Sequence, residues 1–305
     1  MTEDPSESPQ IPNGPVPPPL PTQQLISRWR FALALFLFGL YPLWMAVLNE
    51  IGSSNNEDSQ MVGPALGNSS DQLLSSVFFG MIVFLILLAI CWSISKFSMR
   101  GVGLDWADNR TSTQFLSKFF LSIPKGIGWS IVLRFLPLLI LLPGFFIYSL
   151  IGEVNEDQIS ELVPKVETLI SREALSNDPF YLFLNLSLVS FIVAGLREEL
   201  WRGVSFYLLQ KLFPEQINNK KGKAFMVVIV ALIFGIGHLP QGIMGVLLTS
   251  VLGVGLGFLQ IWHKSIWEAT MAHGFFNATS FLLMAYGVDD LIKELNEQAP
   301  ALFTF

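Results

Sequence analysis

The sequence predicts an all-α membrane protein, a bundle of about seven transmembrane helices that follows a disordered N-terminal arm. Three observations predict this class. The 305 residues are 51% hydrophobic and 14% charged, and the mean hydropathy of +0.52 exceeds that of ordinary soluble domains. Several charge-poor runs reach about twenty residues, which is long enough to cross the hydrocarbon core as a helix. Basic residues are concentrated in alternate loops between these runs.

Residues 1–27 are rich in proline, serine and other polar residues. A segment of this composition buries too little apolar surface to offset the entropy lost on ordering, so we expect a disordered cytoplasmic arm. It does not resemble a secretory signal, which has a basic start followed by an apolar stretch. The first apolar run is therefore expected to be retained as a span.

Seven apolar runs are candidates for membrane spans. The clearest cover residues 31–48, 74–94, 127–151 and 242–262. Weaker candidates cover residues 180–196, continuing towards 213, and then 224–239 and 266–287.

The positions of lysine and arginine predict the orientation, because basic residues of short loops stay on the cytoplasmic side. Arg28 and Arg30 precede the first span, whereas residues 50–72 contain neither lysine nor arginine. The segment up to residue 125 is basic again, so residues 28–125 are read as N-terminal transmembrane helices with a cytoplasmic loop. The pattern places the N-terminus in the cytoplasm and the acidic tail, residues 288–305, outside. In a bacterium the membrane would be the inner one.

Two further observations limit the function. Cys91 is the only cysteine, which excludes an intramolecular disulfide and a thiolate metal site. The net charge of −6 comes largely from the predicted outer loops and tail, so we expect the lipid bilayer as a partner and no nucleic acid.

Polar residues cluster in three apolar segments of the C-terminal half. An ionisable group at membrane depth costs about 2.5–3.5 kcal/mol on insertion scales, so such a cluster indicates a functional site. In each segment two notable residues are four positions apart, which places both on one face of a helix. These pairs are Glu198 with Arg202, Phe234 with His238, and His273 with Asn277.

The cluster has the groups needed to activate a water molecule. A carboxylate can act as a base or metal ligand, imidazoles can bind metal or move protons, and an amide can donate to an oxyanion. Glu199 points about 100° away from Glu198 on a helix and is a further candidate. Glu198, His238 and His273 also form a ligand set known for zinc, so a divalent metal and metal-free activation both stay open.

The three segments resemble, in order and spacing, the motifs of the CPBP group of intramembrane proteases, also called the Abi or CAAX-protease family. The family pattern is Glu-Glu-x-x-x-Arg, then Phe-x-x-x-His, then His-x-x-x-Asn, and the second and third motifs match here unaltered. The resemblance implies a catalytic membrane core at residues 126–287. It also implies a membrane-embedded endopeptidase that hydrolyses membrane-associated protein or peptide substrates, which are prenylated CAAX proteins for some members.

The resemblance also implies roles for individual residues. Glu198 would be the base, and His238 would position the water or a metal. His273 and Asn277 would stabilise the tetrahedral oxyanion, while Arg202 would keep Glu198 ionised and oriented.

The first motif departs from the family, because it reads Glu-Glu-x-x-Arg and is one residue short. Alignment on Arg202 places Glu198 at the second glutamate and Arg197 at the first. The other alignment keeps Glu198 and Glu199 and deletes one residue before Arg202, which rotates the pair by about 100° relative to the arginine. We prefer the first, because it retains the pairing of Glu198 with Arg202 on one face.

Other interpretations remain. Glu198 and Arg202 can simply neutralise each other, His238 can end a helix and bond a carbonyl, and His273 with Asn277 can clasp two helices. Arg197 in place of the first glutamate favours a non-catalytic member of the same fold that serves as a membrane scaffold, immunity factor or chaperone. A transporter is less favoured, since no paired halves are visible.

Overall fold

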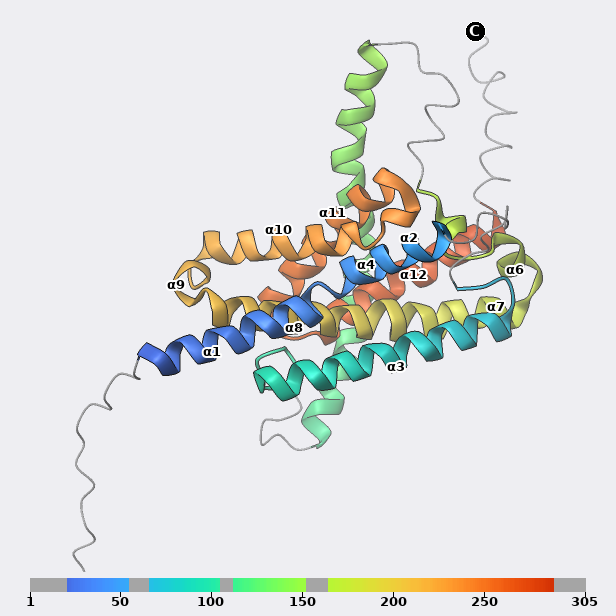
Figure 1. Cartoon of the computed structure of the whole chain (residues 1–305). Coiled ribbons are helices and arrows are strands. Elements are labelled where there is room, and N and C mark those ends of the chain that lie inside the picture. The colour runs from blue at the N-terminus through green and yellow to red at the C-terminus, as the bar shows by residue number, and fades with distance from the viewer. Residues whose placement is uncertain (1–20, 55–65, 105–111, 152–163, 288–305) are drawn as a thin grey trace, which may run out of the picture.

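The structure is a computed structural model, and it describes residues 21–54, 66–104, 112–151 and 164–287. Within these ranges the regular elements are helices and no strand occurs (Figure 1), which confirms the predicted all-α class. Residues 1–20 of the predicted arm and the whole acidic tail, 288–305, lie outside the described residues, as do parts of the two predicted outer loops.

The N-terminal helices are α1 (Pro21–Ala34), the π-helix η1 (Leu35–Gly39) and α2 (Tyr41–Ser54). Helix α1 takes in residues 21–27, for which we expected a disordered arm. Proline is favoured at the first position of a helix, and no further proline or glycine follows until Gly39, so the helix extends to Pro21. The chain bends by 44° between Arg28–Gly39 and Tyr41–Val47.

Helices α3 (Ser70–Ser95) and α4 (Ser112–Ile151) follow. Lys96 ends α3 in the left-handed conformation. Helix α4 runs steeply across the other long helices in Figure 1. Arg134 joins it to the last helix, where its Nη2 donates to the carbonyl oxygen of Phe276 at 2.6 Å. Arg134 is thus a structural link between helices.

One long helical stretch contains the first polar motif. It consists of α7 (Pro179–Leu184), the π-helix η4 (Asn185–Arg197) and α8 (Glu198–Leu212). Asp178 caps its start by accepting from the backbone N–H groups of Phe180 and Tyr181 at 2.9 and 3.1 Å. The short helices η3 (Val166–Thr168) and α6 (Arg172–Asn177) precede it.

The remaining helices carry the other two motifs. They are α9 (Pro214–Ile217), α10 (Lys220–Ile236), the 3₁₀ turn η5 (Leu239–Gln241), α11 (Gly242–His263) and α12 (Trp267–Tyr286). The main apolar core gathers around α8 and includes the buried side chains of Trp201, Leu208 and Phe234. The site residues therefore come from three helices that share this core.

Four helices within the described ranges are long and apolar enough to span a membrane, and a fifth is added if the bent N-terminal pair is one span. Each of the five overlaps a predicted run, although Leu116–Leu138 begins eleven residues before the run predicted at 127–151. Helix α10 has 17 residues, at the lower limit for crossing hydrocarbon, and α12 carries the polar residues Glu268, His273 and Asn277. The protein is an integral membrane protein built of helices, and the total of seven spans stays a prediction.

Candidate active site

The two glutamates of the first motif begin α8 and differ in exposure. The side chains of Glu199 and Arg202 are fully buried, whereas the side chain of Glu198 is 20% exposed. Glu198 follows directly on the π-helix η4, in which backbone bonds run from residue i to i+5. One carboxylate is thus enclosed by the fold and the other is partly exposed.

Arg202 forms an ion pair with Glu199, three residues earlier, through Nη1 and Oε1. The predicted pairing of Glu198 with Arg202 is therefore wrong. Glu198 instead has Arg197 beside it, with Nη2 at 3.5 Å from Oε1. Positions i+3 and i+4 both lie on the same helix face, so helix spacing allows either glutamate, and packing against the neighbouring helices decides for Glu199.

His273 of α12 lies between the two carboxylates. Its Nδ1 is 3.0 Å from Oε1 of Glu199, and its Nε2 is 3.9 Å from Oε2 of Glu198. A carboxylate can only accept, so Nδ1 carries the hydrogen in the bond to Glu199. Both glutamates reach the site, as in the alignment that keeps Glu198 and Glu199. Our preferred alignment left Glu198 as the only base on that face, and the geometry does not support it.

His238 lies just beyond the end of α10, with its Nδ1 at 2.9 Å from the carbonyl oxygen of Phe234. The carbonyl bond that we considered as an alternative is thus present. The bond also determines where the proton lies on the ring. A carbonyl oxygen only accepts, so Nδ1 carries the hydrogen, and in the neutral ring Nε2 is then a free acceptor. The ring of His238 packs on Phe234, as does the ring of His273, so this imidazole belongs to the same cluster.

Phe234 packs in the middle of these groups. Its ring centroid is 4.9 Å from Cζ of Arg202, and the rings of His238 and His273 lie at 4.7 and 6.0 Å from it. An aromatic face attracts a cation when the two are desolvated together. The phenylalanine of the second motif therefore supports the buried guanidinium and packs against both imidazoles.

Asn277 lies one turn beyond His273 on α12 and is half-buried. Its side chain makes no hydrogen bond to any residue in the described ranges. The clasp considered for His273 with Asn277 is therefore not seen among the described residues: His273 bonds Glu199 instead, and the amide of Asn277 is available to another group.

The three predicted metal ligands, Glu198, His238 and His273, do not form a metal site in this geometry. In the described part of the chain, no three His, Cys, Asp or Glu side chains converge closely enough to hold an ion. Binding of zinc or another divalent metal stays a prediction.

Sequence reasoning missed one buried contact of the site. The side-chain Nε2 of Gln260, on α11, donates to the backbone oxygen of Glu199 at 2.9 Å. A lone amide in an apolar helix, on the same face as Gly253 and Gly257, was the available signal.

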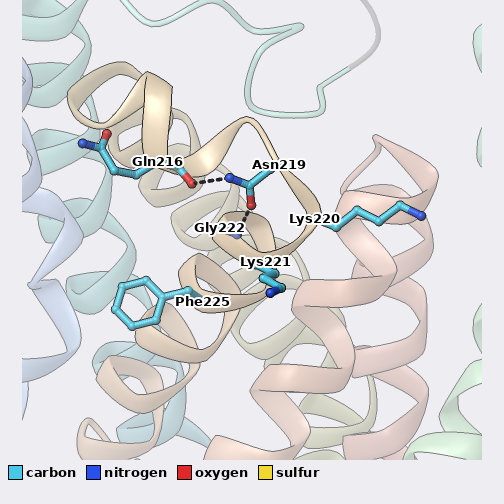
Figure 2. A pocket seen from close by; sticks show the side chains of 6 residues that line it. All are labelled: Gln216, Asn219, Lys220, Lys221, Gly222 and Phe225. Carbon is cyan, nitrogen blue, oxygen red and sulfur yellow. Dashed lines mark hydrogen bonds between the residues drawn. The ribbon is translucent and has the colours of Figure 1, made fainter.

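A separate hollow lies at the turn between α9 and α10 (Figure 2). It is lined by Gln216, Asn219, Lys220, Lys221, Gly222 and Phe225. Asn219 closes the turn, since its Oδ1 accepts from the backbone N–H of Gly222 at 2.8 Å. None of the predicted site residues lines this hollow, so it is not part of the glutamate and histidine cluster.

Comparison with known proteins supports the resemblance of the motifs. The family model described as type II CAAX prenyl endopeptidase Rce1-like matches residues 180–279, a segment that contains all three motifs. No curated protein and no solved structure matches the chain. The match agrees with the CAAX-protease resemblance seen in the three motifs, and residues 180–279 of this chain are similar to the Rce1-like type II CAAX prenyl endopeptidases.

Proposed function

We propose that this protein is an intramembrane endopeptidase of the CAAX-protease type, which hydrolyses a peptide bond of membrane-associated substrates. The observation that carries the proposal is the position of His273 between Glu199, which is buried, and Glu198, which is partly open. Groups with the same chemistry in different environments can take different roles. The enclosed carboxylate orients the imidazole, and the open one is free to act on water.

In this proposal Glu198 is the general base. It takes a proton from a water molecule while the water oxygen forms a bond to the scissile carbonyl carbon. The electron pair of the carbonyl moves to its oxygen and gives a tetrahedral oxyanion. When the carbon–nitrogen bond breaks, the proton on Glu198 passes to the leaving nitrogen.

The other residues hold the reacting groups. The free Nε2 of His238 accepts a hydrogen bond from the attacking water, and the amide of Asn277 donates to the oxyanion. His273 is fixed at Nδ1 by Glu199 and presents Nε2 on the side of Glu198. Binding of a zinc ion would require the side chains of Glu198, His238 and His273 to move closer together. The metal content of the purified protein distinguishes this metal-dependent mechanism from the metal-free one.

The proposal includes seven spans, a cytoplasmic N-terminus and, in a bacterium, location in the inner membrane. Helices α10 and α12 would be the additional spans, since α10 has no charged residue after Lys223 and Glu268 and His273 of α12 are buried within the bundle. Substrates would reach the site from the bilayer as membrane-associated proteins or peptides, with prenylated CAAX proteins among the candidates.

The test compares new protein termini, by mass spectrometry, in membranes that hold equal amounts of wild type, Glu198→Gln or His238→Ala. We expect a set of termini that is present in the wild type and absent from both variants. Glu215→Gln and His263→Gln are matched controls, because they change the same residue types outside the cluster, and both should retain the termini.

Identical termini in all five samples would contradict the proposal. That outcome would favour the non-catalytic scaffold, immunity factor or chaperone, for which Arg197 beside Glu198 is the supporting observation.

A further inference from the structure

We propose that Gln260 is a positioning residue for the glutamate pair. Its amide fixes the rotation of α8 about its axis, so that Glu199 meets His273 while Glu198 stays partly open. The effect on catalysis rests on the proposed peptidase function, whereas the effect on the geometry of His273 does not.

The contact is buried and specific. Gln260 is 5% exposed, and its Nε2 donates to the backbone oxygen of Glu199 at 2.9 Å. The bond joins residues 61 positions apart and attaches α11 to the first turn of α8. Because it is made to the backbone, it holds the helix and leaves the carboxylate free to bond His273.

A stripe of glycines brings the amide within reach. Gly253, Gly257 and Gln260 are spaced by four and three residues, so they lie on one face of α11. A Cβ atom at Gly253 would be 3.1 Å from Cδ1 of Phe234, and one at Gly257 would be 2.9 Å from Cγ1 of Val227. Small residues therefore let α11 approach α10 closely and bring Gly257 near the ring of Phe206 on α8, and the next residue along the stripe is the amide.

The rotation of α8 decides which glutamate faces inward. Glu198 and Glu199 differ by about 100° around the helix, and an arginine is available to each of them. The helix continues from η4, whose π-helical winding differs from that of an α-helix. Contacts from neighbouring helices hold the resulting rotation, and Gln260 supplies one on the backbone of Glu199.

The chemistry of the residue supports this role. The Oε1 of Gln260 has no hydrogen-bond partner among the described residues, and a buried amide that is only half bonded costs free energy that an apolar side chain would not. The bond to Glu199 is thus the specific contribution of an amide at this position.

The experiment replaces Gln260 by methionine, which keeps the length and removes the amide. The substrate is a peptide that covers a cleavage site found by the comparison of termini. We expect kcat to fall about ten-fold and KM to stay within about two-fold, because a buried hydrogen bond is lost and no substrate contact is removed. Thr249→Val is the matched control on α11, since its hydroxyl bonds only the carbonyl oxygens of Gly245 and Val246 in its own helix, and it should not change kcat.

A second measurement does not depend on cleavage. The chain has three histidines, so ¹⁵N labelling of histidine gives a simple spectrum in which His263, outside the cluster, is an internal reference. We expect the His273 resonances to move in Gln260→Met and to stay in place in Thr249→Val. In Gln260→Asn the side chain is one methylene too short to reach Glu199, so this variant should behave like Gln260→Met. It serves as the second variant if Gln260→Met does not accumulate in the membrane.

Unchanged kcat together with unchanged His273 resonances would overturn the inference. If the wild type cleaves nothing, the proposed function fails, and the His273 resonances alone decide whether Gln260 positions the pair.

Discussion

Arg202 is a fully buried cation. Its neighbours compensate for the free energy that is lost when a charge is removed from water. It has the carboxylate of Glu199 on one side and the ring of Phe234 on another. Its Nε and Nη2 have no hydrogen-bond partner in the described part of the chain, and buried polar groups of this kind commonly bind ordered water. Arg202 is therefore the counter-charge of Glu199 and part of a polar interior that a hydrolytic site needs.

We predict that Arg202→Met lowers the free energy of unfolding by about 3–5 kcal/mol, because it leaves the carboxylate of Glu199 buried without compensation. The double variant with Glu199→Gln should recover part of this loss. Denaturant unfolding in detergent measures both. Lys223→Met, which removes an exposed cation from α10, is the control and should change little. A double variant less stable than Arg202→Met would contradict the pairing.

For individual residues, the sequence identified which side chains lie together in the candidate site, but not which of them form pairs. Glu198, Glu199, Arg202, His238 and His273 were all named from motif spacing, and all lie in one cluster. The partner of Arg202 was mistaken because spacings of three and four are equivalent on a helix surface. The contact of Gln260 depends on the approach of a helix that is distant in the chain, which no local pattern contains.

Helices α4 and α12 meet at Gly126, where a Cβ atom would overlap Cβ of Met271 and come within 2.9 Å of its backbone carbonyl carbon. Gly128, two residues later in α4, would have nothing within 4 Å of an added Cβ. We predict that Gly126→Ala costs about 1–3 kcal/mol through overpacking. Gly128→Ala should be neutral or stabilise the helix by up to about 1 kcal/mol. Thermal unfolding in detergent checks both, and equal shifts for the two alanines would refute the close contact.

Asp178 joins the start of α7 to the start of α3, since its Oδ2 accepts from the hydroxyl of Ser70 at 2.8 Å. That hydrogen bond is the main cause that lowers the pKa of Asp178 below the usual 3.8, and the backbone N–H of Tyr181 adds to it. A carboxylate whose folded pKa is lowered stabilises the fold above its unfolded pKa, and the contribution is lost as the pH falls through the folded value.

We therefore predict that Asp178→Asn lowers the unfolding temperature at pH 6 and that the difference from wild type shrinks as the pH falls below 3.8. Unfolding in detergent across this range measures it. Asp71→Asn, in the first turn of α3, is the control for loss of a nearby carboxylate. A difference for Asp178→Asn that stays constant with pH would exclude the mechanism.

Most of the predicted apolar runs correspond to helices of the structure, but two features of these helices were not predicted. Hydropathy reports length and composition, so the runs at 74–94 and 242–262 were found with nearly correct limits. It carries no information on winding, and the π-helices η1 and η4 were therefore not expected. The bend near Leu40 lies between the π-helix η1 and Pro42, both of which are recognised causes of helix kinks, and the proline was the signal available in the sequence.

On the scale of the whole molecule, the sequence predicts how the chain is oriented in the membrane, and an experiment on cells can test this orientation. We predict that a cysteine at position 68, introduced as Asn68→Cys, faces outward, and that Gln216→Cys, at the hollow of Figure 2, faces the cytoplasm. Both changes are made in a Cys91→Ser background, which removes the buried native thiol.

A membrane-impermeant maleimide should label Asn68→Cys in intact cells and Gln216→Cys only after permeabilisation. The reverse pattern would invert the topology, and labelling of both in intact cells would mean that the two positions share a side and that the span count between them is even.

The looser winding of η4 also bears on how such chains change length during evolution. A one-residue deletion in an α-helix turns everything downstream by about 100° relative to what lies upstream. In η4 the same deletion can be absorbed by rewinding from i+5 to i+4 bonds, with Glu198 and Glu199 kept in place. A gap in an alignment of relatives at residues 185–197 would then record a change of winding, and the two carboxylates that follow it would still be equivalent.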